Sequence, residues 1–153
     1  MQINRTLLCA FLLAAGIAAQ SPASAAVVDL LLKIDGVDGE STRKDFEKWI
    51  DIESFAFGVT NAQNGNSSGS GVRKPVFSPV NITKQLDSTS PKLFELTAGG
   101  KHIKNAILDL VSVGGDKPHK TMEYTFEDVL LTSVSLSGGS GGVPMESVSF
   151  TYD

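Results

Sequence analysis

The sequence has few of the residues on which small exported domains and metalloenzymes depend. Its single cysteine, Cys9, stands in an apolar stretch near the start, so no disulfide can stabilise the rest of the chain. The two histidines, His102 and His119, show neither a His-Glu nor a His-x-x-x-His spacing. The sequence therefore predicts a domain that is stable through core burial or assembly, without a metal and without a cofactor.

Basic residues are also in short supply. Lysine and arginine number 13 against 17 aspartates and glutamates, and the formal net charge is −4. Residues 1–25 contain one charged residue, Arg5, so the rest of the chain carries about −5. Nucleic acid or an anionic membrane surface would require a dense basic patch, and the lysines here are scattered. We expect neither as a partner.

The first 25 residues have the pattern of a secretory signal peptide. Arg5 gives a basic start, an uncharged apolar run extends from Leu7 to Ala19, and Ala23-Ser24-Ala25 is a small-x-small cleavage pattern. The run is shorter than the ~20 apolar residues of a membrane-spanning helix. We expect residues 1–25 to be a signal peptide, residues 26–153 to be one domain, and the protein to be secreted or periplasmic without stable membrane insertion.

Most of the remaining chain alternates between apolar and polar residues, as half-buried β-strands do. In residues 27–34, the apolar residues Val28, Leu30, Leu32 and Ile34 share one side of the predicted strand. The charged run 40–48 is interpreted as a loop. Further strands are predicted over residues 49–60, 74–87, 103–113, 120–137 and 146–152. In the segment 74–87, residues Val76, Val80, Ile82 and Leu86 lie on one predicted side, and the long segment 120–137, with Phe126, Leu130 and Val134 in phase, is expected to bend.

The segment 49–60 changes face part-way along. Ile50 and Ile52 share one side, whereas from Phe55 onward the apolar residues occupy the other. Such a shift predicts a bulge or bend near Ser54, at which the strand turns a barrel corner. The side opposite the phenylalanines then carries only the small residues Ser54, Ala56 and Gly58. Either lack of space beside a neighbour or a functional surface would explain it.

One helix is predicted, over residues 90–98. Ser90 is the expected N-cap, Pro91 suits the first turn, and Gly99 or Gly100 provides a left-handed exit. An apolar side of this helix must cover a sheet, and its members are Leu93, Phe94 and Leu96. The strand at 103–113 is apolar on both faces, so we expect the helix or a neighbouring subunit to cover its second face.

No catalytic set is evident, and the chain is not predicted to be an enzyme. A serine, a histidine and an aspartate occur in almost any chain this rich in serine, so their presence carries little weight. Residues 61–72 form a Gly-, Ser- and Asn-rich loop, and a loop of this length is usually either disordered or used in contacts. A small all-β domain with these features suits a binding module or a self-assembling protein better than a hydrolase.

Several segments in order resemble the Hcp family, the haemolysin-coregulated tube proteins of bacterial type VI secretion, over nearly all of residues 26–153. The matching segments are Val28-Asp-Leu-Leu-Leu-Lys-Ile34, Gly39-Glu-Ser41, Ile50-Asp-Ile52, Phe55-Ala-Phe-Gly58, Asp87-Ser-Thr-Ser-Pro-Lys-Leu93, Gly100-Lys-His102, Val129-Leu-Leu-Thr-Ser-Val-Ser135 and Gly138-Gly-Ser-Gly-Gly142.

The resemblance implies a mainly β fold, a β-barrel of two antiparallel sheets with one flanking helix. It also implies head-to-tail rings of six subunits that stack into a hollow tube and carry small effector proteins. Ser54, Ala56 and Gly58 would then face the lumen. The loop that helps rings to stack would include Asn61, Asn64, Gly65, Asn66, Gly69 and Val72.

The predicted signal peptide departs from this family, whose tubes assemble in the cytoplasm. Two interpretations therefore stay open. The first is an exported ring-forming structural protein. The second is an exported monomeric binding module that retains the fold, consistent with the leader and with a last strand that ends the sequence at Asp153.

Overall fold

The computed structural model describes residues 27–61, 74–113 and 118–153. The predicted signal peptide and most of the predicted stacking loop, including Asn64, Gly65, Asn66, Gly69 and Val72, lie outside the described residues. The elements in chain order are β1 (Val28–Ile34), β2 (Ile50–Ile52), β3 (Ser54–Ala56), β4 (Val59–Thr60), β5 (Val76–Phe77), β6 (Val80–Gln85), α1 (Ser90–Gly99), β7 (His102–Ser112), β8 (His119–Ser137) and β9 (Met145–Thr151).

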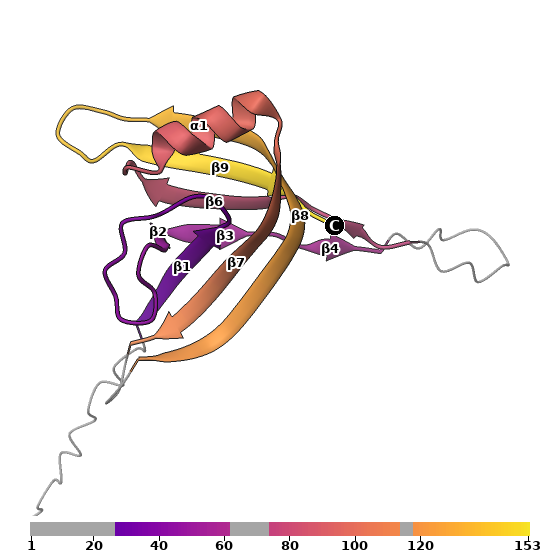
Figure 1. Ribbon diagram of the computed structural model, residues 1–153, viewed down its shortest axis with the longest axis horizontal. Helices are drawn as coiled ribbons and strands as arrows, with labels where there is room; N and C mark the ends of the chain where they lie inside the picture. Colours follow the sequence, from indigo (N-terminus) through magenta and orange to yellow (C-terminus); the bar gives the residue numbers. More distant parts are fainter. Residues whose placement is uncertain (1–26, 62–73, 114–117) are drawn as a thin grey trace, which may run out of the picture.

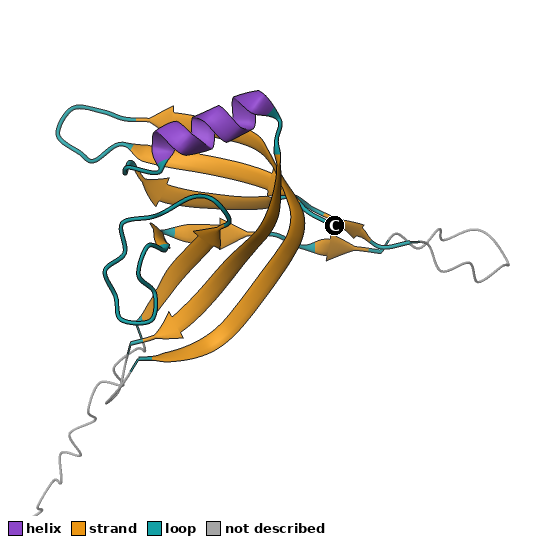
Figure 2. Cartoon of the chain, viewed as in Figure 1, coloured by secondary structure: helices purple, strands orange, loops and turns teal. Residues whose placement is uncertain are grey.

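The strands form two antiparallel sheets, and one helix lies over the larger sheet, as Figures 1 and 2 show. The larger sheet has the order β2-β1-β7-β8-β9-β6-β3 and is strongly curved, while β4 and β5 pair in a separate hairpin that projects from it (Figure 1). The predicted class, mainly β with two antiparallel sheets and one flanking helix, is confirmed.

The two outermost strands of the larger sheet, β2 and β3, are consecutive in the sequence. A single residue, Glu53, separates them, and its backbone N–H donates to the carbonyl of Thr83 at 2.8 Å. Ile52 of β2 is thus the last residue that pairs with β1, and Ser54 of β3 is the first that pairs with β6. The predicted change of face near Ser54 is confirmed, because at Glu53 the chain crosses from one edge of the curved sheet to the other.

The core fills the concave side of the sheet with aliphatic and aromatic residues from almost every strand. The buried members are Leu32, Ile34, Val37, Ile50, Ile52, Val80, Ile82, Leu93, Ile103, Ala106, Leu108, Phe126, Val129, Leu131, Val148 and Phe150. In β7, Leu108 faces this core, whereas its neighbour Asp109 faces the other way and is buried as well. Both faces of this strand are therefore buried in its second half, as its two-sided sequence predicts, but the helix packs against β8 on the core side and does not cover the face that carries Asp109.

Strand β8 changes face twice. Phe126 is buried, but after Asp128 the buried positions are Val129 and Leu131, and after Thr132 the inward position is Val134. Asp128 has a positive φ of 46°, and the pairing with β9 shifts register between Leu131 and Ser133. The predicted bend therefore lies at the positive φ of Asp128, where the pairing with β7 keeps its register, and at the register shift with β9, which marks a bulge. Leu130, expected in phase with Phe126, is only half-buried, because the change of face at Asp128 gives the buried positions to Val129 and Leu131.

Helix α1 packs against β8 and buries Leu93, while Leu96 is half-buried and Phe94 remains 42% exposed. The helix ends at Gly100, whose φ of 57° is the left-handed exit that the sequence predicts. The predicted N-cap is wrong. Thr89 precedes the helix without a side-chain cap, and the Ser90 hydroxyl is occupied elsewhere, donating to the Glu146 carboxylate at 2.8 Å.

The segment that contains β5 and β6 is only partly as predicted. Val80 and Ile82 are buried, but Val76 and Leu86 are 66% and 41% exposed. The third buried residue of this parity is Lys84. The apolar alternation of the sequence therefore identifies the strand, but not the limits of its buried part.

Candidate functional site

A face of small polar side chains extends across four strands on the convex side of the larger sheet. In one row the register aligns Ser54 of β3, Thr83 of β6, Ser147 of β9 and Ser135 of β8. In a second row it aligns Ala56, Asn81, Ser149 and Ser133. All eight side chains are exposed or half-buried. We call these eight residues the hydroxyl face.

The hydroxyl face is neutral, and its groups already bind one another. The Ser54 and Thr83 hydroxyls are 2.6 Å apart, and the Ser149 hydroxyl donates to the side-chain oxygen of Asn81 at 2.5 Å. Since neighbouring strands are ~4.8 Å apart, the rows form a smooth surface without a long side chain. Such a surface offers a passing polypeptide few strong contacts.

The structure places two of the predicted lumen residues, Ser54 and Ala56, within the hydroxyl face, and Gly58 lies exposed just beyond the end of β3. The six other members were not predicted. The sequence did contain a signal for part of them, because Ser147 and Ser149 alternate with the buried residues of β9. What it could not supply is the strand order that brings β6, β8 and β9 beside β3.

The projecting hairpin of β4 and β5 is the second candidate surface. At its base the Gly58 N–H donates to the Ser78 hydroxyl at 2.7 Å, and the Ser78 N–H donates to the Gly58 carbonyl at 2.8 Å. Its side chains Val59, Val76 and Phe77 are more than half exposed. Asn61 is exposed at the end of β4 and is the one member of the predicted stacking loop that the structure describes.

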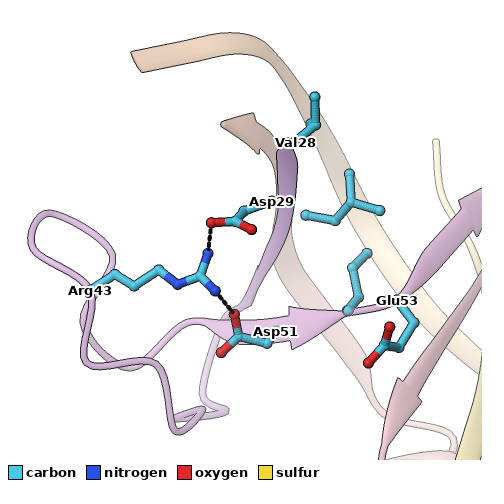
Figure 3. A pocket seen from close by; sticks show the side chains of 7 residues that line it. Val28, Asp29, Arg43, Asp51 and Glu53 are labelled. Atoms are coloured by element: carbon cyan, nitrogen blue, oxygen red, sulfur yellow. Dashed lines mark hydrogen bonds and ion pairs between the residues drawn. The ribbon is translucent and has the colours of Figure 1, made fainter. Parts of the chain in front are cut away.

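A polar hollow of about 250 Å³ lies beside β1 and β2 (Figure 3). From the loop that follows β1, the Arg43 guanidinium reaches back to the carboxylates of Asp29 and Asp51, the latter at 3.2 Å. These contacts fasten the loop to the sheet. The lining residues shown contain no nucleophile beside a general base, so the hollow has no evident catalytic chemistry.

A buried charge cluster connects the start of α1 to the sheet. The Lys84 ammonium lies 2.9 Å from Glu146 and 2.8 Å from Asp87, and the side chains of Lys84 and Glu146 are fully buried. Ser90 adds its hydrogen bond to Glu146. Sequence reasoning missed this cluster, although Lys84 shares the parity of Ile82 and Glu146 that of Val148. We assign it a structural role, because the side chains of Lys84 and Glu146 are closed off from solvent.

His102 lies beside an exposed carboxylate, and His119 is exposed at the start of β8. The Nδ1 atom of His102 is 2.7 Å from the Asp128 carboxylate, and both side chains are more than half exposed. The pair joins the start of β7 to Asp128, the residue of β8 at which the strand changes face. Residues 27–61, 74–113 and 118–153 contain no group of three or more His, Cys, Asp or Glu side chains placed to bind a metal ion. Within the same residues, no helix is long and apolar enough to span a membrane.

Comparison with known proteins places this architecture in one family. The family model described as "Type VI secretion system effector, Hcp" matches residues 31–153. The chain belongs to the Hcp family. The protein hcp1 of Pseudomonas aeruginosa is 33% identical over 116 residues, which cover 75% of this chain and 71% of that protein.

Solved structures agree with this assignment. A structure described as a type six secretion system protein has 33% sequence identity and a TM-score of 0.76, covering 82% of this chain and 80% of the other. Hcp1 from Salmonella typhimurium has 32% identity and a TM-score of 0.70, with coverage of 82% and 81%. The Hcp fold predicted from the sequence motifs is therefore confirmed.

Proposed function

We infer that this protein is a structural, tube-forming component of type VI secretion and that it acts without catalysis. Membership of the Hcp family supports this role. The finer proposal is that six chains form a head-to-tail ring and that rings stack into a hollow tube. A subunit of such a ring needs two different complementary faces, because each contact is heterologous.

The observation that carries the proposal is the hydroxyl face. Its two rows cross four strands without a charged or large apolar side chain. A solvent-exposed sheet surface usually mixes charged and polar residues, so uniform small neutral groups over this extent indicate a specific use. We propose that this face, together with Gly58, lines the lumen of the ring, where small effector proteins slide past without strong adhesion.

Location follows from the same proposal together with residues 1–25. We propose that those residues act as a signal peptide and that the protein is secreted or periplasmic. N-terminal sequencing of the protein recovered outside the cytoplasm tests this point. A first residue at Ala26 supports it, whereas a chain recovered only from the cytosol and beginning at Met1 contradicts it.

Accessibility of the hydroxyl face tests the assignment of the lumen. With Cys9 replaced by serine, a cysteine is placed at Ser135, or at Lys101 as an exposed control outside the face. We expect a maleimide carrying a bulky polymer to label Ser135→Cys much more slowly than Lys101→Cys in assembled protein, and equally fast after unfolding in urea. Equal rates in assembled rings would remove the hydroxyl face from the lumen. A monomer that labels equally at both sites would favour the binding module.

A further inference from the structure

Strand β8 belongs to two parts of the curved sheet in turn. As far as Leu130 it pairs with β7, and from Leu130 to Ser137 it pairs with β9. The two parts meet near Asp128, where the strand changes face. Only the second part carries residues of the hydroxyl face, Ser133 and Ser135. The backbone at Asp128 therefore influences how that part of the face is oriented relative to β7.

The backbone at Asp128 has a conformation that most residues avoid. Its φ of 46° lies in the left-handed region, and no other residue within the described strands has a positive φ. Aspartate and asparagine tolerate this region better than most side chains, although they do not prefer it. Such a conformation persists when the surrounding contacts hold the chain in place. The contacts of Asp128 are therefore the next point of interest.

His102 makes such a contact. Its Nδ1 atom lies 2.7 Å from the Asp128 carboxylate, the distance of a charge-assisted hydrogen bond. His102 is also the residue of β7 that pairs with Leu130, the last β8 residue in that ladder. The contact between the two side chains thus closes the β7–β8 ladder at the point where β8 continues beside β9 alone.

Other charged side chains surround the imidazole of His102. They line, together with His102, a hollow of about 460 Å³ between α1, the turn after β1 and the start of β7, and they are Asp35, Lys92, Lys101 and Lys104. The three ammonium groups repel a protonated imidazole, whereas the carboxylates of Asp35 and Asp128 attract it. Among the described residues, Asp128 provides the charged group in ion-pair contact with the ring.

We propose that His102 and Asp128 form a pH-sensitive latch that holds the change of face in β8. Histidine is the side chain that ordinarily changes charge between pH 5 and 8. A protonated imidazole forms an ion pair with the carboxylate, whereas a neutral ring donates the same hydrogen bond without the attraction between opposite charges. The latch therefore tightens as the medium becomes more acidic. It acts within one chain, so it goes beyond the proposed ring and does not depend on it.

Hydrogen exchange of the amides from Leu131 to Ser137, followed by mass spectrometry, tests the latch. Asp128→Asn is the decisive variant, because asparagine also suits the left-handed backbone and keeps a hydrogen-bond acceptor, but carries no charge. At a pH of about 5.5 we expect these amides to exchange about two- to fivefold faster in the variant than in the unmodified protein, the scale of one exposed ion pair. At a pH of about 8 the two proteins should exchange at nearly equal rates.

His102→Gln is an independent variant, and it should show the same faster exchange in the acidic buffer. His119→Gln is the matched control, because the other histidine of the chain lies at the exposed start of β8. This control should exchange as the unmodified protein does in both buffers. A difference between Asp128→Asn and the unmodified protein that is equal in both buffers would give Asp128 a purely conformational role and overturn the latch. Unchanged exchange in His102→Gln would overturn it as well.

Discussion

The residue whose environment departs most from expectation is Lys84, a lysine with a fully buried side chain. Its ammonium is compensated by Glu146 and Asp87, and it also donates to the Gln85 carbonyl at 2.8 Å. A buried ion pair often adds little net stability, but removing one partner leaves an uncompensated charge in the interior. The cluster therefore makes the positions of β6, β9 and α1 depend on one another.

Single replacements in this pair should be costly. We expect Lys84→Met or Glu146→Leu to lower the free energy of unfolding by about 3–5 kcal/mol each. The double variant should lose clearly less than the sum, because neither buried charge is then left facing an empty site. Urea unfolding of the four proteins in a double-mutant cycle measures this coupling. Additive losses would show that the two side chains act independently.

Asp109 offers a second test at this scale, through pH. Burial raises the pKa of its carboxyl above the ordinary value of 3.8, although Lys120, 2.7 Å away, opposes the shift. The folded state thus favours the protonated form. The stability that this adds is complete below the ordinary pKa and is lost as pH rises through the raised pKa.

Asp109→Asn removes this titration. Compared with the variant, the unmodified protein should gain stability as pH falls from about 7 towards 4, because only the unmodified protein takes up the proton. The difference in urea midpoint between the two proteins, followed across that range, measures the effect. A difference that is constant, or that moves in the opposite direction, would contradict the assigned environment of Asp109.

Sequence patterns located most elements because alternation reflects which side of a strand is buried. They did not show that Lys84 and Glu146 are buried. A charged residue at a position where the alternation calls for an apolar one is normally taken to be exposed. They also missed which residues join Ser54 in the hydroxyl face, since the register between β3, β6 and β9 depends on contacts distant in sequence. The residue pattern of a segment indicates that it forms a strand, whereas contacts between distant segments decide which strands lie beside it.

At the scale of elements, the loop after β1 depends on one glycine. The N–H of Gly39 donates to the carbonyl of Lys48 at 2.8 Å, and the Ser41 N–H donates to that of Trp49 at 3.0 Å. A Cβ on Gly39 would lie 2.1 Å from the Trp49 oxygen. Only glycine allows the two backbone segments to approach this closely.

Gly39→Ala should therefore destabilise the protein by about 1–3 kcal/mol or displace the loop that carries Arg43. Gly139→Ala is the matched control, because a Cβ there meets no atom within 4 Å. Thermal unfolding of both variants gives the comparison. Equal melting temperatures for the two would show that the close approach at Gly39 does not constrain the fold.

At the scale of the whole molecule, the fold places three kinds of side chain in different regions. The concave side of the curved sheet holds the core, the convex side of β3, β6, β9 and β8 presents the hydroxyl face, and most exposed large apolar side chains lie on the β4–β5 hairpin and near the end of β6 and the β8–β9 turn. The proposed ring would use the hydroxyl face to line its lumen, and closure of subunits into a ring is the central claim.

Sedimentation velocity of the purified protein over a range of concentrations up to the high micromolar tests that claim most directly. We expect a species with the mass of six chains, with larger multiples appearing as concentration rises. A single monomeric species at every concentration would contradict the account and leave a monomeric binding module with the Hcp fold in its place.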